Sequence, residues 1–506
     1  MPSPYTSLSW QTCLLSLTFP LLALARSTLF EHATIVSYDE ANGIPLVLRN
    51  SSLLITNDRI AAIFPTSSSD ASNVTADFER IDATGDIIVP GFIDTHRHSW
   101  QTAQRTIAGN ATLAEYITHW TNTTLLAEVY DGDVMYDSQL LGFLEAIDAG
   151  VTTIVDHASA TWNEEVTRAA HRAHIDSGIR GIFAPQIGTK PGNFTLQAQF
   201  ELWRELQVQS QEQSNLISMG LAYETFDIGA SAEIEQVVEF IRNSNATALE
   251  THFVGGVDGN ENSPSLLASL GLLNLSTPVI FIHSNSINPT DATLLRRFNH
   301  YISSAVGYEM SHGADLTRTI HISDQASLSV GTNYAQSGDL ISQARLWLQR
   351  GRDQLYGPER ANWRVPANNP ISTNQAFLLA TRSGGLALRR PELGVLQVGA
   401  KADIVVFDGT APGLLGFDDP VAAIVMHSHV GQIKHVLIDG EWRKRDGRLV
   451  DEGVEQVRQR FVAASRRVQR FWTDLPRPVL EGQWLTGAPY SRIQQCDVVR
   501  GTGTGY

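Results

Sequence analysis

From residue 28 to residue 86, short hydrophobic runs alternate with turn residues. The runs ATIVSYD, PLVLRNSSLLITNDRIAAIF and FERIDATGDIIV are rich in β-branched residues and have the lengths of strands. Turn pairs separate them, among them Asn42-Gly43, Asn57-Asp58 and Thr84-Gly85. The pattern predicts a small all-β unit at this end of the chain.

After Pro90 the pattern changes to short apolar strands that alternate with amphipathic helices. GVTTIVDHAS reads as a strand, EEVTRAAHRAHIDSGI as a helix that Gly178 ends, and RGIFAPQIG as the next strand. The same alternation continues through EIEQVVEFIRN, ATALETHFVGG and TPVIFIHSN. This predicts the α/β class, with a TIM-type (β/α)8 barrel over residues 89–390.

Strand-like character returns in LGVLQVGAKADIVVFDG and HVGQIKHVLIDGEWRKRDGRLV. We expect residues 26–88 and 391–450 to form one small composite β-sandwich domain from the two ends of the chain. Residues 451–506 are predicted to be a C-terminal helical extension and tail, because VEQVRQRFVAASRRVQRFW has helical periodicity.

The first residues differ from the rest of the chain. CLLSLTFPLLALA is an apolar run too short to span a bilayer and ends in Ala23-Leu24-Ala25, so residues 1–25 are interpreted as a signal peptide. Residues 1–12 contain no Lys or Arg, and a buried N-terminal helix is the alternative. We expect a secreted, N-glycosylated protein, because seven Asn-x-Ser/Thr acceptors follow: Asn50, Asn73, Asn110, Asn122, Asn193, Asn245 and Asn274.

Charge and cysteine content narrow the function further. The net charge of −16 repels phosphate backbones, so nucleic acid is not expected as a partner. Our expectations for the other partners are a small-molecule substrate and no membrane, with a homo-oligomer left open. Loss of Cys13 with the signal peptide leaves Cys496 alone. A disulfide framework and a cysteine zinc site are therefore excluded, and any metal must be held by histidines and carboxylates.

The stretch GFIDTHRHSWQ contains the strongest candidate chemistry. Side chains alternate along a strand, so His96 and His98 are expected on one face. His252 and His283 end two later strand-like runs. Strand ends line the active face of a barrel, and neutral imidazoles there suit one divalent ion, zinc first, with iron or manganese as alternatives.

IIVPGFIDTHRH resembles the first-strand signature of the amidohydrolase superfamily, in its cytosine deaminase and chlorohydrolase-like branch. EAIDAGVTTIVDHAS, VGAKADIVVFDG and HVLIDGEWRKRDGRLV extend the resemblance from Leu29 to Val450. It implies a metal-dependent barrel in which His96, His98 and His252 bind the metal. In mononuclear members the position of His283 binds metal or contacts water and substrate. A carbamylated lysine is not expected, because Lys190 alone lies between Ile93 and His283, in a loop-like stretch.

The sequence departs from the family at two carboxylates. The proton-shuttling Glu expected three residues after His252 is Gly255, and the strand-eight Asp corresponds either to Gly331 or to Asn333, depending on the alignment. Asn333 offers a weak carbonyl ligand but no base near neutral pH. Asp324 lies too early in the strand to replace the Asp well, so His283 is the preferred general acid/base.

The remaining candidates are weaker. His157 is assigned a catalytic role at a strand end, with a structural role equally open. Trp100, Gln101 and Glu309 are assigned to the substrate pocket, with packing or an ion pair as their alternatives. Other histidines fall in helical stretches and are expected to face solvent: His119, His171 and His174.

Taken together, these residues predict a hydrolase that uses metal-activated water on a non-peptide carbon–nitrogen bond, such as an amide, lactam or aminated ring. Two alternatives stay open because both family carboxylates are absent. One is a lyase, dehydratase or isomerase of specialised metabolism on the same barrel. The other is a secreted pseudoenzyme.

Overall fold

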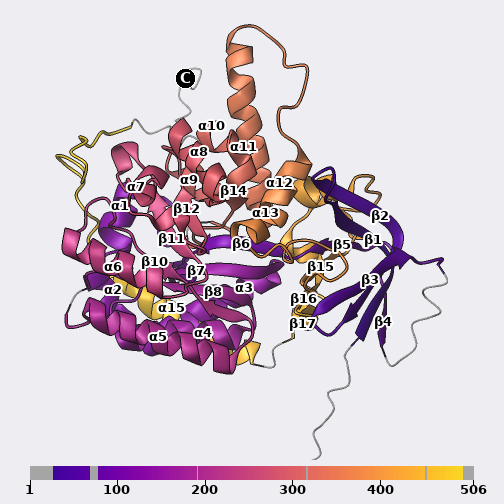
Figure 1. Ribbon diagram of the computed structural model, residues 1–506, viewed down its shortest axis with the longest axis horizontal. Helices are drawn as coiled ribbons and strands as arrows, with labels where there is room; N and C mark the ends of the chain where they lie inside the picture. Colours follow the sequence, from indigo (N-terminus) through magenta and orange to yellow (C-terminus); the bar gives the residue numbers. More distant parts are fainter. Residues whose placement is uncertain are drawn as a thin grey trace, which may run out of the picture.

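A computed structural model describes residues 27–68, 78–190, 192–314, 317–334, 336–450 and 453–493. The predicted signal peptide, the acceptor Asn73 and Cys496 lie outside these ranges. The chain forms a barrel with surrounding helices and, beside it, a sheet built from both ends of the chain (Figure 1).

The barrel strands are short, parallel and buried. They form a four-stranded sheet, β6 to β9, and a five-stranded sheet, β10 to β14. Isolated bridges Gln186–Ala222 and Arg97–Gly331 join the two sheets, and β9 and β10 are one strand interrupted at Gly220. The predicted (β/α)8 barrel is therefore confirmed. Its strands are β6 (Phe92–Arg97), β7 (Val151–Ala158), β8 (Arg180–Pro185), β9 (Ile217–Met219), β10 (Leu221–Ala222), β11 (Leu249–Phe253), β12 (Val279–His283), β13 (Tyr301–Ser304) and β14 (Ala326–Leu328).

Helices cover the outside of the barrel. Helix α4 illustrates how local sequence sets their ends: the Asn163 side chain accepts from the Val166 amide at the start, and Gly178 takes the left-handed conformation (φ 68°) at the end. Among the described helices, none combines the length and the hydrophobicity needed to cross a membrane. The helices are α1 (Leu113–Glu115), α2 (Thr123–Val129), α3 (Gly132–Asp148), α4 (Glu164–Ser177), α5 (Leu196–Gln213), α6 (Ser231–Asn243), α7 (Pro264–Ser269), α8 (Pro289–Phe298), α9 (Val306–Ser311), α10 (Thr317–Ile320), α11 (Leu340–Ala361), α12 (Thr373–Ala380), α13 (Arg382–Ala387), α14 (Pro420–Ala422) and α15 (Val454–Asp474).

Strands from both ends of the chain share one nine-stranded sheet, in which β5 pairs with β15. The sheet curls, so that Phe30 of β1 meets Trp442 of β17 with ring centroids 6.0 Å apart. The predicted composite domain is thus one curled sheet that encloses its own apolar core. Its strands are β1 (Ser27–Asp39), β2 (Ile44–Thr56), β3 (Arg59–Pro65), β4 (Glu79–Asp82), β5 (Ile87–Pro90), β15 (Ile404–Phe407), β16 (Ile433–Ile438), β17 (Glu441–Arg445) and β18 (Arg448–Leu449).

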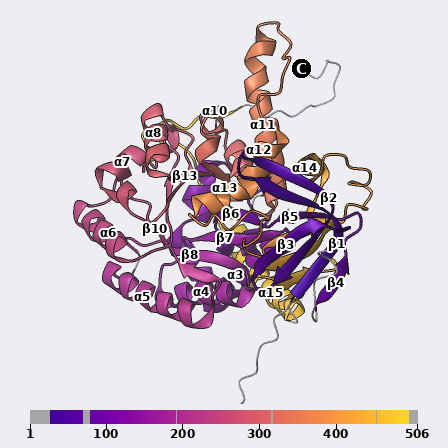
Figure 2. The same cartoon turned by 45° about the vertical axis from the view of Figure 1, so that its right-hand side comes forward.

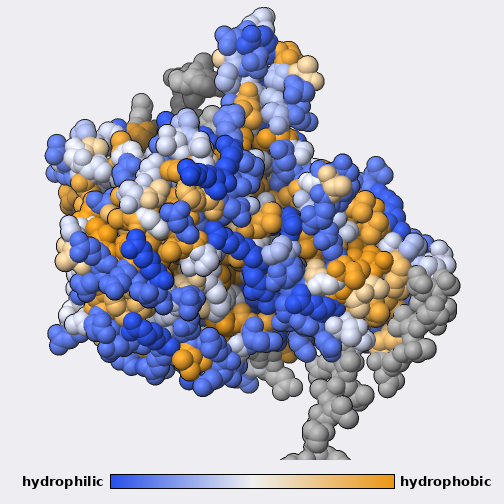
Figure 3. All heavy atoms as spheres, viewed as in Figure 1, coloured by the Kyte–Doolittle hydropathy of each residue, from blue (hydrophilic) through white to orange (hydrophobic). Residues whose placement is uncertain are grey.

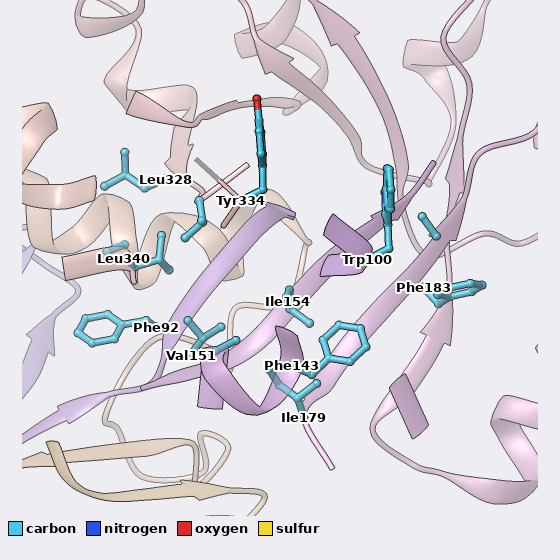
Figure 4. Close-up of a cluster of buried hydrophobic side chains, with 14 of the residues drawn as sticks. Phe92, Trp100, Phe143, Val151, Ile154, Ile179, Phe183, Leu328, Tyr334 and Leu340 are labelled. Atoms are coloured by element: carbon cyan, nitrogen blue, oxygen red, sulfur yellow. The ribbon is translucent and has the colours of Figure 1, made fainter. Parts of the chain in front are cut away.

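Buried ion pairs and a large apolar core fix the two parts together. Arg180 of β8 is 3.0 Å from Asp403, which precedes β15. Between the barrel and its helices, Phe143, Ile154 and Ile179 belong to one apolar cluster (Figure 4). Helix α11 projects from the molecule in both ribbon views (Figures 1 and 2). The face drawn in Figure 3 is mainly hydrophilic, with an apolar patch over the curled sheet.

Three histidines expected in solvent are buried instead. His171 and His174 of α4 face the barrel and contact Phe183 and Phe143, while His119 packs on Trp120. The helical stretches were recognised correctly. The prediction that the rings face solvent was wrong, because the sequence does not show which side of each helix meets the barrel.

Candidate metal centre

Three histidines converge at the carboxyl ends of the barrel strands. His96 lies in β6, His98 follows the last residue of that strand, and His252 lies on β11, across the barrel mouth. The ring centroids of His96 lie 4.8 Å from those of His98 and 5.0 Å from those of His252. One coordinating nitrogen from each of the three lies within 4.8 Å of the other two. The structure therefore brings together the three residues that the sequence assigned to the metal.

His283 stands beside this trio with a carboxylate behind it. It ends β12 in the left-handed conformation (φ 67°), and its Nδ1 lies 3.0 Å from Oε1 of Glu309. Glu309 is buried in α9, where it also accepts from the Ala305 amide. The His283 ring stacks on Tyr308. Glu309, assigned to substrate binding, therefore contacts His283 and holds its ring.

His157 occupies the centre of a chain of imidazoles and carboxylates. Its Nε2 lies 3.2 Å from Oε1 of Glu224, and its Nδ1 lies 3.2 Å from Oε2 of Glu250. Glu224 Oε1 is also 2.9 Å from Nδ1 of His252, and Glu250 Oε1 is 3.3 Å from Nδ1 of His96. The two carboxylates thus link His157 to two of the three candidate ligands.

Glu224 and Glu250 were missed in the sequence. Glu250 lies two residues before His252 in the same strand, so the strand period places both on one face, and this signal was available in LETH. Glu224 follows β10, an element of two residues with no strand signature of its own. Its place beside His252 follows from barrel closure alone.

The third ligand, His98, has a different acceptor behind it. Its Nδ1 lies 3.0 Å from the backbone carbonyl of His157 and 3.2 Å from Oγ of Ser159. In all three rings Nδ1 is therefore placed against an acceptor, which leaves Nε2 for an ion. Such partners behind the ligands fix the tautomer and orientation of metal-binding histidines.

Burial keeps the His96, His98 and His157 rings neutral by lowering the pKa of each. It lowers the pKa of His98 to about 3, with His252 contributing repulsion. The pKa values of His96 and His157 fall well below their ordinary range for the same reasons. Burial, reinforced by the Glu224 carboxylate, raises the pKa of Glu250. Neutral imidazole is the form that binds a metal.

Gly331 occupies the strand-eight position. Its amide donates to the His96 carbonyl, its carbonyl accepts from the His98 amide, and it lines the cavity with φ 71°. Asn333 points elsewhere and donates to Thr102 and Glu145. The structure thus resolves the two alignments in favour of Gly331, and no carboxylate approaches from this strand.

Among the described residues, no other carboxylate takes the place of the two that the family carries at the strand-eight position and three residues after His252. Asp324 forms an ion pair with Arg296, 2.7 Å away, on the outside of the barrel. At Gly255, φ is 78° and a Cβ would lie 2.4 Å from Ser286, so the loop has no room for a glutamate. Neither family carboxylate has a substitute at its own position.

A cavity of about 350 Å³ opens over the histidines. Trp100 lines it, whereas the buried Gln101 donates from its amide to the Tyr116 hydroxyl and so supports a wall residue. Lys190 reaches the same cavity, and burial lowers its pKa to about 8. The apolar and aromatic part of the lining includes Leu113, Tyr116, Ile117, Leu126 and Tyr308.

The donor set fits a divalent ion. Imidazole nitrogens and carboxylates are ligands for zinc and other first-row metals. Both ring nitrogens of His157 and Oε2 of Glu250 are buried without a hydrogen bond among the described residues. Buried carboxylates next to neutral imidazoles are costly unless a positive charge compensates them. A bound dication would supply that charge.

Relatives named as deaminases match most of this chain and most of their own length. A 5'-deoxyadenosine deaminase of Methanobrevibacter smithii is 24% identical over 427 residues, covering 80% of this chain and 91% of the relative. A 5-methylthioadenosine/S-adenosylhomocysteine deaminase of Thermococcus sibiricus is 24% identical over 435 residues, covering 79% and 91%.

Solved structures share the fold. A variant of atrazine chlorohydrolase from Arthrobacter aurescens, complexed with zinc and atraton, superposes with a TM-score of 0.73 at 20% identity, covering 87% of this chain and all of that one. An adenosine deaminase from Xanthomonas campestris with bound zinc gives 0.73 at 17% identity, covering 88% and 99%.

The family model described as the amidohydrolase family matches residues 87–443, which include the whole barrel and the strands that return to the curled sheet. This match covers well over half of the sequence. The chain therefore belongs to the amidohydrolase family.

Proposed function

We propose that this protein is a metal-dependent hydrolase that cleaves a non-peptide carbon–nitrogen bond of a small, flat ring compound. One observation carries the proposal: three imidazoles converge at the barrel mouth beside the His283–Glu309 pair, under a cavity with aromatic walls. The named activities of the deaminase relatives support an aminated ring as substrate.

His96, His98 and His252 would hold the ion, with zinc the first choice. A bound divalent ion supplies Lewis acidity and makes water a stronger nucleophile near neutral pH. The aromatic walls, Trp100 and Tyr308 among them, would hold a planar substrate by stacking.

His283 is assigned the proton transfer. Glu309 fixes its Nδ1, so Nε2 is the nitrogen that accepts a proton from water and delivers it to the leaving nitrogen. The Glu309 carboxylate stabilises the ring while it carries the extra proton. Both groups stand on elements next to the trio, β12 and α9.

The test is ammonia release from zinc-loaded full-length protein, with aminated purine nucleosides, pyrimidines and triazines, and with amides and lactams, as substrates. We expect His283→Gln to lower kcat about 100- to 10,000-fold while zinc content stays the same. His321→Gln, an exposed histidine outside the cavity, is the matched control. Absence of turnover on the whole panel by a zinc-loaded protein would refute the hydrolase.

Gly331 favours a second candidate, a lyase or isomerase, because the strand that normally supplies a base for water supplies none here. The two reactions differ in the source of oxygen. In water enriched in oxygen-18, a hydrolytic product acquires the label, whereas a product of elimination or rearrangement does not.

We also propose that the protein is secreted and N-glycosylated, as the N-terminal sequence predicts. The asparagines of the acceptors in the described residues all have exposed positions, which supports this: Asn50, Asn110, Asn122, Asn193, Asn245 and Asn274. Amino-terminal sequencing of protein from the culture medium, with glycan release by an amidase, tests both parts. A mature chain that begins before residue 20 would contradict the signal peptide.

A further inference from the structure

Three imidazoles bring no negative charge to a bound dication, so by themselves they hold the ion weakly. Gly331 and Gly255 replace the two carboxylates of the family, and neither position has room or a side chain for one. Neutral ligands leave the full charge of the ion in a buried site, where an uncompensated charge is costly. A metal centre in this chain needs negative charge from other residues.

We propose that Glu224 and Glu250, joined through His157, are positioning residues for the metal: Glu250 orients His96, and Glu224 orients His252 and returns negative charge from behind it. The inference rests on the proposed metal centre. The groups that support the metal ligands would then lie on β7, on β11 and just after β10, on the side of the barrel away from β14.

The contacts form a continuous path from one ligand to the other. Starting at His96, the successive separations are 3.3 Å to Glu250, 3.2 Å on to His157, 3.2 Å to Glu224 and 2.9 Å to His252. The His252 backbone amide also donates to Oε2 of Glu224 at 3.0 Å. Each carboxyl group therefore contacts one candidate ligand and His157: Glu224 through a single oxygen, Glu250 through its two oxygens.

His157 explains how two carboxylates are held together in this interior. It is fully buried, and both of its nitrogens lack another partner among the described residues. A neutral ring has one N–H, so His157 donates to one of the two carboxyl groups and accepts from a protonated oxygen of the other. Opposing carboxylates at such a separation repel each other unless a donor or cation stands between them.

The His283–Glu309 pair gives an internal comparison. It has the same imidazole–carboxylate contact, at 3.0 Å, but His283 lies outside the three-histidine set. Removing the charge of Glu309 should therefore affect proton transfer without affecting metal affinity. A carboxylate behind a ligand and a carboxylate behind an acid/base residue are separable by their readouts.

The experiment measures zinc affinity of the purified full-length protein against a competing chelator. We expect Glu224→Gln, Glu250→Gln and His157→Gln each to raise the zinc Kd about 10- to 100-fold, the usual effect of losing a partner behind a ligand. Glu309→Gln is the matched control, with an unchanged Kd. The melting temperature of each metal-free variant is measured in parallel, because a merely structural role would lower that temperature and leave Kd unchanged.

Glu224→Gln keeps the test valid if the deeper variants fail to fold, since Glu224 is partly exposed at the cavity. A wild-type Kd in Glu224→Gln overturns the proposal. So do two ions per chain that fall to one in His157→Gln, because His157 and Glu224 would then be ligands themselves. A wild-type protein without zinc defeats the metal centre and this inference together, whereas a zinc-loaded protein without turnover defeats only the hydrolase.

Discussion

Two groups of inward-facing histidines among the described residues have opposite surroundings. In the cavity, His96, His157 and His252 have carboxylates 2.9–3.3 Å from their nitrogens. In helix α4, His174 stacks on Phe143 with centroids 4.3 Å apart, and neither of its nitrogens has a partner among the described residues. Its neighbour in the helix, His171, contacts Oγ of Ser210 at 2.7 Å.

Burial lowers the pKa of His96 and His157 in the cavity and that of His171 and His174 in α4. The pKa of His174 falls to about 3, as does that of His98, although one ring packs in an apolar core and the other lines a cavity. A lowered histidine pKa therefore does not by itself mark a functional site. The distinguishing features are the acceptors behind Nδ1 and the access of the ring to a cavity.

The largest difference is expected for metal content. His96→Ala should reduce it from about one divalent ion per chain to none, because two imidazoles cannot close the site. The matched variant in the other group, His174→Leu, should retain the ion. Elemental mass spectrometry of both proteins decides this, and equal metal content in the two variants would erase the distinction between the groups.

The second difference concerns acid. His174 has an ordinary pKa of 6.5 in the unfolded chain and a pKa of about 3 in the folded protein. Above pH 6.5 the ring is therefore neutral in both states, and it contributes its full share to the free energy of unfolding. As the pH falls from 6.5 towards 3, only the unfolded state gains the proton, and the free energy of unfolding decreases. We expect His174→Leu to recover about 2 kcal/mol at pH 5 and little at pH 8, measured by urea unfolding of metal-free protein.

If the free energy of unfolding fell equally in His174→Leu and in wild type as the pH was lowered from 8 to 5, this ring would not titrate as a buried neutral group. His321→Leu, at an exposed position, controls for the general effect of removing a histidine.

The strand-eight side of the cavity should respond in stability but not in metal binding. Gly331 has φ 71°, and a Cβ there would lie 2.8 Å from Cβ of Ala305. We expect Gly331→Ala to lower the free energy of unfolding by about 1–2 kcal/mol, because the left-handed backbone disfavours a side chain. Zinc affinity should stay unchanged. A large fall in affinity would mean that the Gly331 backbone takes part in holding the ligands.

The smallest effect is expected at Ser210. Ser210→Ala leaves Nε2 of His171 without its hydrogen bond, which should cost about 1 kcal/mol. Metal content and turnover should not change, because α4 packs on the outside of the barrel. Thermal unfolding and the zinc assay together test this, and a loss of zinc would connect the two histidine groups.

Much of the fold was predictable because its signals are local. The end of α4 at Gly178 and the shared face of His96 and His98 follow from capping and from the strand period. Motif resemblance added the family and the place of His252. The burial of His171 was not predictable in the same way, since the α4 sequence shows a helix but not the depth at which one face meets β8.

The site beyond the motif needed the structure for the same reason. Both Gly331 and Asn333 were plausible from spacing, and only the bridge between Gly331 and β6 decides between them. Glu224 follows a two-residue strand, and its contact with His252 spans 28 residues of sequence.

By itself, the sequence determined the barrel, the curled sheet that the two ends of the chain complete, and the three imidazoles that can bind a metal. These depend on periodicity and on short motifs within single strands. Only the tertiary structure decided which groups stand behind those imidazoles, because that depends on the register between strands far apart in the chain. In this protein the register brings two glutamates and His157 to one side of the metal centre and leaves a glycine on the other.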